Sequence, residues 1–177
     1  MEGGFYSTGW GNNCSLKPSQ LPGPDPESWG WNNVSGVPFN TWDSTAITKN
    51  GSHALGFSIC ATAPTPGRNC VAYQNVYLGG ANAQAIFVAS GYHTDGNCPP
   101  ILAWNRGKDQ FDPLVAEAAG RYSFICSDNW GQRNTWTMRQ LDVQADASGY
   151  ITIMVGGAAH TGTALGAVVC IDDVSVK

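Results

Sequence analysis

The chain has 177 residues, of which 42% are hydrophobic and 12% are charged, a composition typical of one folded domain and not of a disordered tail. Its formal net charge is −4, and its Lys and Arg residues are scattered singly, so the sequence lacks the basic patch with which proteins neutralise nucleic-acid phosphates. No apolar run approaches the roughly 18 residues that a membrane span requires. We therefore expect a single domain over residues 1–177 that binds no nucleic acid and has no membrane span.

Short runs of alternating apolar and polar residues recur along the chain, separated by segments rich in Gly, Pro and Asn. This pattern is typical of strands joined by turns, and only one brief helical candidate, residues 113–119, interrupts it. About nine strands without a long helix predict an all-β, antiparallel two-sheet β-sandwich. In chain order, the predicted strands cover residues 3–6, 45–49, 52–60, 70–78, 84–93, 121–126, 135–143, 150–155 and 168–176.

One face of the predicted strand 84–93 carries small residues. Ala89 and Gly91 lie on the same side as Phe87 and His93, because side chains alternate between the two faces of a strand. This small-residue face leaves room for another group to lie against it.

The six cysteines are even in number and lack the Cys-Xaa-Xaa-Cys spacing of metal sites, which favours disulfides in a secreted, extracellular protein. Cys60 and Cys70 flank a turn-rich loop between two predicted strands, so we predict a disulfide between them. We expect the remaining four to be mostly oxidised, and three pairings of them stay open. The alternative is a set of buried free thiols. The remaining four are Cys14, Cys98, Cys126 and Cys170.

The last stretch, residues 149–176, combines two predicted strands around a loop of small residues. It resembles the C-terminal hairpin of β-jelly-roll carbohydrate-binding modules of the galactose-binding-like superfamily, whose chains commonly close on Ile-Asp-Asp-Val, here residues 171–174. The resemblance implies a jelly roll that binds polysaccharide or oligosaccharide chains without catalysis. It also implies a link to a catalytic or surface domain in the full-length protein.

The adjacent carboxylates Asp172 and Asp173 repel each other at neutral pH, so they need either a cation or hydrogen-bond donors. In the resembling modules a structural calcium often ties the first strand to the last, and Asp172 or Asp173 would then be a ligand, with Glu2 or a backbone carbonyl near Gly3 opposite. Tyr6, however, stands where the family has Glu. The alternative is that one aspartate faces solvent and the other accepts a hydrogen bond from a loop amide.

Catalytic residues are not evident in the sequence. Glycoside hydrolysis needs two carboxyl groups facing each other in a cleft, whereas most aspartates here lie at predicted turns, where they hydrogen-bond the local backbone. The three histidines stand alone, without the motif of a hydrolase nucleophile or the spacing of a zinc site. We therefore expect no enzymatic activity.

Sugar recognition usually combines an aromatic face, on which the apolar side of a pyranose stacks, with amide and guanidinium groups that bind its hydroxyls. Trp130 is surrounded in sequence by polar residues and glycine, so we predict an exposed indole at a loop tip. The predicted ligand-binding residues are Trp130, Tyr92, Trp104, Asn129, Gln132 and Arg133.

These features predict a non-catalytic carbohydrate-binding module. The alternative is an extracellular adhesion or interaction domain on the same fold, such as an appendage, phage-tail or matrix module. A third hypothesis, a small glycan-acting enzyme, needs an acid–base cleft that the sequence does not reveal.

Overall fold

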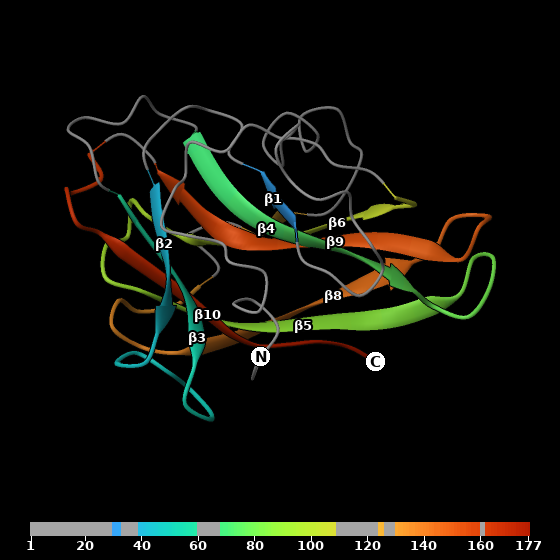
Figure 1. Ribbon diagram of the computed structural model, residues 1–177, viewed down its shortest axis with the longest axis horizontal. Coiled ribbons are helices and arrows are strands. Elements are labelled where there is room, and N and C mark those ends of the chain that lie inside the picture. Colours follow the sequence, from blue (N-terminus) through green and yellow to red (C-terminus); the bar gives the residue numbers. More distant parts are fainter. Residues whose placement is uncertain (1–29, 33–38, 60–67, 109–123, 126–129, 160–161) are drawn as a thin grey trace.

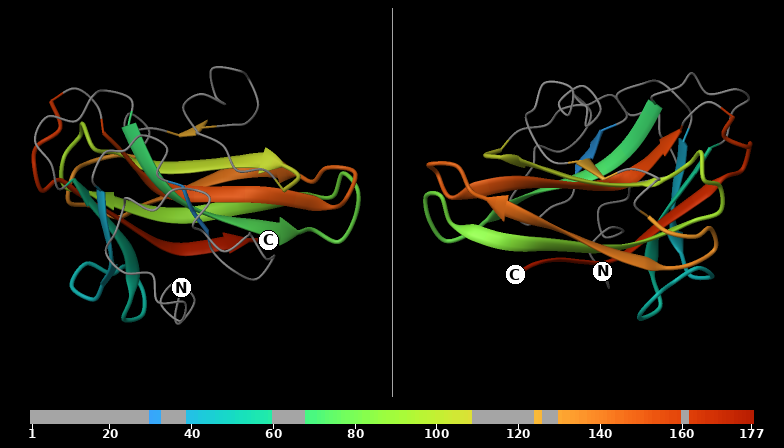
Figure 2. Two further views of the ribbon diagram at one scale, coloured as in Figure 1. Left: turned by 45° about the horizontal axis from the view of Figure 1, so that its top comes forward. Right: turned by 180° about the vertical axis from the view of Figure 1, so that it is seen from behind.

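The computed structural model describes residues 30–32, 39–59, 68–108, 124–125, 130–159 and 162–177. They form ten strands in two five-stranded sheets, ordered β1-β4-β9-β6-β7 and β2-β3-β10-β5-β8, and every pair is antiparallel (Figure 1). The two sheets lie face to face as layers (Figure 2). The strands are β1 Gly30–Asn32, β2 Phe39–Ser44, β3 Ala54–Ile59, β4 Arg68–Tyr77, β5 Gln84–His93, β6 Pro100–Arg106, β7 Phe124–Ile125, β8 Thr137–Gln144, β9 Tyr150–Ala159 and β10 Val168–Val176.

The architecture confirms the predicted all-β jelly-roll sandwich. Strands β5 and β10 have the predicted bounds, because their β-branched and alternating residues match a half-buried strand. The prediction was wrong at residues 45–49, where the chain turns directly after β2. It also missed β6, which lies in a segment that looked irregular. The predicted strand 3–6 and the helical candidate 113–119 lie outside the described residues, and among those described no helix is long and apolar enough to cross a membrane.

The C-terminal stretch is not a hairpin. Strand β9 lies between β4 and β6 in one sheet, whereas β10 lies between β3 and β5 in the other (Figure 1). Each is the middle strand of its sheet, and both carry buried β-branched residues such as Ile151 and Val169. The last stretch therefore supplies the central strand of both layers.

The core lies between the two sheets. On β5, Phe87 and Ala89 are fully buried while Ile86 is 40% exposed, as the predicted alternation requires. A fully buried side chain of this size contributes roughly 1.5–3 kcal/mol through removal of its apolar surface from water. The largest fully buried side chains include Trp130, Phe57, Phe87, Leu55, Ile101, Leu102 and Ile151.

Candidate functional site

Trp130 is buried, so the prediction of an exposed indole was wrong. Its side chain is 0% exposed and belongs to the core cluster between the sheets. Gly91 of β5 provides the space, since a Cβ atom placed on Gly91 would lie only 2.4 Å from the indole ring and 2.9 Å from Pro100. The group that lies against the small-residue face of β5 is therefore Trp130. A ring enclosed in this way cannot stack on a sugar.

The segment after Trp130 lines a polar hollow of about 870 Å³. Its lining includes His93 at the end of β5, which is 2% exposed, and the exposed residues Gln132 and Arg133. We call this the His93 hollow, and its lining residues are His93, Thr94, Gly96, Gly131, Gln132, Arg133 and Asn134.

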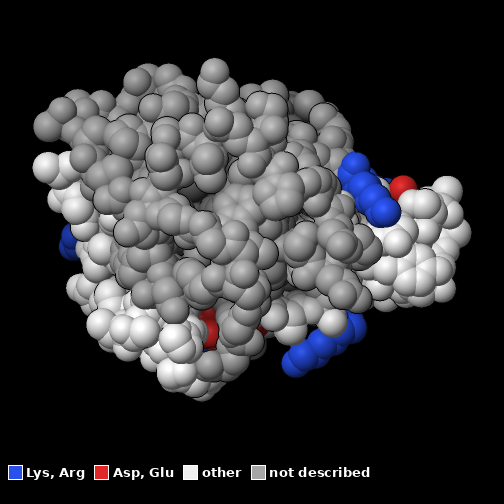
Figure 3. All heavy atoms as spheres, in the orientation of Figure 1, with Lys and Arg blue, Asp and Glu red and all other residues white. Residues whose placement is uncertain are grey.

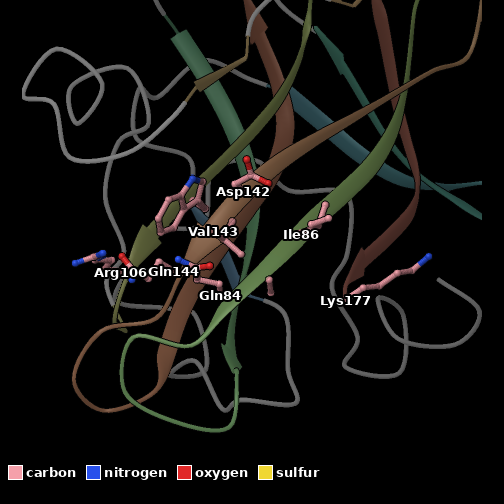
Figure 4. A pocket seen from close by; sticks show the side chains of 9 residues that line it. Gln84, Ile86, Arg106, Asp142, Val143, Gln144 and Lys177 are labelled. Carbon is pink, nitrogen blue, oxygen red and sulfur yellow. The ribbon is translucent and has the colours of Figure 1, made fainter.

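A second hollow, of about 670 Å³, is lined by residues of both sheets, from β6 in one and from β5 and β8 in the other. Strand β7 pairs with β6 only at Leu102 and Ala103, so among the described strands the end of β6 from Trp104 onward has no partner on that side. Trp104 is half-buried there, packed in part against the core. The volume of this hollow lies in the range of small-ligand sites. We call it the Trp104 hollow, and it is lined by Gln84, Ala85, Ile86, Trp104, Arg106, Asp142, Val143, Gln144 and Lys177 (Figure 4).

The side chains around the Trp104 hollow carry both charges and several amide groups. Arg106 and Asp142 are exposed and come from different sheets, and Lys177 closes the chain beside β5 through its backbone bonds to Ile86. The indole Nε1 of Trp104 is enclosed and has no hydrogen-bond partner among the described residues. An orphan donor of this kind is one that a water or a ligand oxygen can satisfy.

The structure divides the predicted binding residues between two places. Gln132 and Arg133 line the His93 hollow, whereas Trp104 lies in the other hollow. The Tyr92 side chain lines neither, since it is half-buried, packs against Trp136 at 5.6 Å between ring centroids and donates a hydrogen bond to Asn134. Asn129 lies outside the described residues. The predicted set did not include four other residues that line the two hollows, because only the strand pairing shows which isolated polar residues meet. These are His93, Arg106, Asp142 and Lys177.

The acidic pair lies at a β-bulge of β10, where the register with β5 shifts between Asp172 and Ser175. Asp172 is 2% exposed, and its Oδ2 accepts hydrogen bonds from the backbone amides of Lys49 and Asn50. Its Oδ1 accepts a bond from the amide of Asp173 at 2.7 Å. This carboxylate therefore ties the loop after β2 to the central strand of the sheet.

Asp173 is partly exposed and forms an ion pair with Lys49 at 2.8 Å. Asn50 donates to both of its oxygens, and the Lys49 ammonium also donates to Ser90. Desolvation would raise the pKa of Asp173, but the hydrogen bonds from Lys49 and Asn50 and the charge of Lys49 together hold it below its ordinary value of 3.8.

These donors do not favour calcium at the acidic pair. Both lone pairs of Asp172 Oδ2 already accept N–H groups, and a Lys49 ammonium occupies the side of Asp173 where a cation would bind. Among the described residues no three His, Cys, Asp or Glu side chains gather where they could hold a metal ion. Glu2, the third predicted ligand, lies outside the described residues, so the calcium site stays a prediction.

Cys98 and Cys170 are buried free thiols, so the expectation that the four remaining cysteines are mostly oxidised is wrong for these two. Burial raises the pKa of Cys98 to about 12, with a further contribution from Asp95, and burial raises that of Cys170 to about 11. Both behave as small apolar core residues. Cys14, Cys60 and Cys126 lie outside the described residues, and the Cys60–Cys70 disulfide stays a prediction.

On the face seen in Figure 3, the Lys and Arg residues that the structure describes stand apart from one another. This agrees with the low charged fraction of the sequence. Among the described residues, the functional candidates are therefore the two hollows.

Solved structures share this fold at low sequence identity. A putative sugar binding protein from Bacteroides thetaiotaomicron is 11% identical, with a TM-score of 0.56 over 94% of this chain and 97% of that chain. The enzymatically active domain of tailspike protein 4 of bacteriophage CBA120 is 11% identical, with a TM-score of 0.52 over 86% of this chain and 19% of that chain. A module described as Family 16 Carbohydrate Binding Module-2 is 16% identical, with a TM-score of 0.46 over 83% of this chain and 89% of that chain.

Comparisons by sequence find no relatives. No protein-family model matches the chain, and no curated protein matches it. At identities this low, structural similarity establishes architecture and not activity. The chain therefore has an antiparallel two-sheet jelly-roll sandwich, and the solved structures that resemble it establish that fold alone.

Proposed function

We propose that this protein is a non-catalytic carbohydrate-binding module that binds glycan chains at the Trp104 hollow. The observation that carries the proposal is a half-buried indole in a ligand-sized hollow whose other lining residues carry amide, guanidinium, carboxylate and ammonium groups. A pyranose presents an apolar C–H face to an indole, and its hydroxyls both donate and accept hydrogen bonds. Gln84 and Gln144 offer both roles, and Arg106 and Lys177 offer donors.

The absence of catalysis rests on the carboxylates of this hollow. Among the described residues that line it, Asp142 is the one carboxylate, whereas glycoside hydrolysis uses two, held about 5–10 Å apart. The fold supports the proposal because a putative sugar binding protein shares it over nearly the whole of both chains.

The even number of cysteines is typical of exported proteins, but Cys98 and Cys170 are free thiols, so this support rests on the other four. Outside the cell, the module would act attached to a catalytic or surface domain. Sandwiches of this kind do occur within longer chains, since the match to the phage tailspike covers only 19% of that chain. The alternative function is an extracellular adhesion or interaction domain on the same fold, and the tailspike match shows only that a phage-tail protein contains this fold, in a domain described as enzymatically active.

The test compares Trp104→Ala with the parent in binding to a panel of soluble polysaccharides. Stacking of a nucleic-acid base on an aromatic ring contributes roughly 1–3 kcal/mol, and a sugar stacked on the indole by analogy should be bound about 10–100-fold more weakly by the variant. Tyr77→Ala is the matched control, because Tyr77 is 55% exposed and lines neither hollow.

The expected result is a loss of affinity in Trp104→Ala and an unchanged affinity in Tyr77→Ala, with both proteins folded by circular dichroism. Equal affinity of the parent and Trp104→Ala would remove this hollow from the site. A parent that binds no glycan in the panel would favour the adhesion domain.

A further inference from the structure

We propose that the His93 hollow is a second sugar site, which holds one hydroxyl-bearing sugar residue by hydrogen bonds instead of by stacking. This inference rests on the proposed glycan-binding function. The two sites would contact different parts of a chain, because they lie at opposite ends of the β5–β8 strand pair.

The imidazole of His93 is a buried acceptor without a donor. Its Nδ1 lies 3.0 Å from the carbonyl oxygen of Asp95, and a carbonyl oxygen only accepts. Nδ1 therefore carries the proton, and in the neutral ring Nε2 is left with a lone pair. Nε2 is enclosed and has no hydrogen-bond partner among the described residues. A buried acceptor left without a donor destabilises the fold. Because His93 also lines the hollow, we infer that a ligand in the hollow supplies the missing donor.

The chemistry of the hollow selects a ligand with hydroxyl groups. The lone pair of His93 Nε2 needs an O–H or N–H donor, which a carboxylate or a phosphate dianion lacks. Arg133 offers donors to the same ligand, and no described acidic side chain forms an ion pair with it. Gln132 adds an amide that can donate and accept. Neighbouring hydroxyls on a sugar ring satisfy both requirements, since each gives one hydrogen and accepts another.

Three segments hold the hollow in shape before any ligand binds. The Asp95 carboxylate accepts bonds from the amides of Asn97 and Ala164, and the Asp95 carbonyl also accepts one from Cys98. On the other side, the amide of Asn134 donates to the carbonyl of His93 at 2.8 Å. Buried Trp130 anchors this second segment from below. Groups fixed in this way lose little freedom on binding, which favours affinity.

The experiment follows the histidine ring nitrogens by ¹⁵N NMR in the intact chain. Substituting His53→Gln and His160→Gln in turn assigns the His93 signals among the three histidines. The probes are the methyl glycosides of glucose, galactose, mannose and xylose at millimolar concentration. Arg133→Ala tests the rim, since its side chain is exposed and its loss should leave the fold intact. Trp104→Ala serves as the matched variant at the other hollow.

The expected spectrum shows His93 protonated on Nδ1, with an Nε2 signal that shifts when at least one glycoside binds. That shift should persist in Trp104→Ala, and in Arg133→Ala it should require at least about tenfold more glycoside, because a charged donor is lost.

The outcomes separate the two proposals. A proton on Nε2, or a glycoside that shifts the Trp104 indole signal and leaves His93 unchanged, overturns the second site alone. A shift at His93 without any response at Trp104 overturns the proposed Trp104 site instead. If no glycoside shifts either the His93 or the Trp104 signal, both proposed sugar sites are wrong. The lone pair of His93 Nε2 then accepts a hydrogen bond from water.

Discussion

The two hollows use their nearest tryptophans in opposite ways. Trp104 is half-buried and lines its hollow, whereas Trp130 is enclosed beneath the segment that lines the other. Ile86 and His93, one from each hollow, are seven residues apart on β5, which places the hollows roughly 20 Å from each other. One hollow is therefore suited to stacking and the other to hydrogen bonding.

The difference shows what decides the position of an indole. Trp130 has polar neighbours along the chain, yet it is buried because Gly91 on the facing strand leaves a space of the right size. Trp104 has Ala103 and Asn105 as neighbours, both buried, yet it borders a hollow, and among the described residues β7 pairs with β6 only at Leu102 and Ala103. In both cases the local sequence does not predict the environment of the indole.

Truncating Trp130 should give the largest effect. Trp130→Ala removes a fully enclosed indole, and such substitutions typically lower the free energy of unfolding by about 3–5 kcal/mol. Trp104→Ala should cost clearly less, because part of that indole already contacts water. Urea denaturation of the two variants beside the parent measures both values. Equal losses would mean that the two tryptophans do not differ in burial.

Gly91→Ala gives an independent check on the same contact. Its new methyl group would lie 2.4 Å from the Trp130 ring and force the indole to shift. A variant as stable as the parent would show that no ring fills this space.

The rim of the His93 hollow should respond to a backbone change. Gly131 has φ of 75°, and a Cβ there would lie 2.9 Å from Thr137 Oγ1. Gly131→Ala should therefore cost about 1–3 kcal/mol and weaken binding at the His93 hollow, while binding at the Trp104 hollow is unchanged. Thermal unfolding and glycoside titration measure the two effects.

Gly96→Ala is the matched control on the same rim, where a new Cβ would meet nothing within 4 Å. It should leave the stability equal or raised by roughly 0.4–1 kcal/mol, because the unfolded chain loses freedom. A similar loss in both glycine variants would refute the role assigned to the backbone of Gly131.

Sequence reasoning succeeded where a pattern is local. The alternation along β5 and the β-branched run of β10 fix both strands residue by residue, since half-burial imposes a period of two. It failed for β6, whose residues Pro100 to Ala103 are all buried and so show no alternation. A continuously buried strand has no periodic signal of its own.

The candidate sites could be predicted only in part. Trp104, Gln132 and Arg133 do line hollows, but sequence placed them in one site because it could not show which ends of the strands meet. The burial of Trp130 depends on Gly91, about 40 positions earlier in the chain. The unpaired Nε2 of His93 depends on the absence of a donor among the described residues. Neither leaves a trace in a short window of sequence.

The smallest effect on stability should come from removing the ion pair between Lys49 and Asp173. Asp173 lies on β10, where Ser90 of β5 also contacts Lys49, and neither hollow includes these residues. Asp173→Asn removes the charge and keeps a residue that tolerates the positive φ of 52° at this position. A partly exposed pair contributes about 0.2–1 kcal/mol, so the variant should be slightly less stable at pH 7 and should bind glycosides like the parent.

The pH dependence of this difference follows from the pKa of Asp173. Because folding lowers that pKa, the carboxylate stabilises the folded state fully above its ordinary value of 3.8, and this contribution is lost as the pH falls through the lower, folded value. The stability gap between the parent and Asp173→Asn should therefore be constant from pH 7 to about pH 5 and close below pH 4. High salt should also narrow this stability gap, since salt screens an exposed ion pair.

A stability gap that stays constant down to pH 2 would mean that the variant loses packing or hydrogen bonds and not a charge. A loss of glycoside binding at either hollow would show that the strand pair transmits changes between its ends, and the two sites could then no longer be treated as independent.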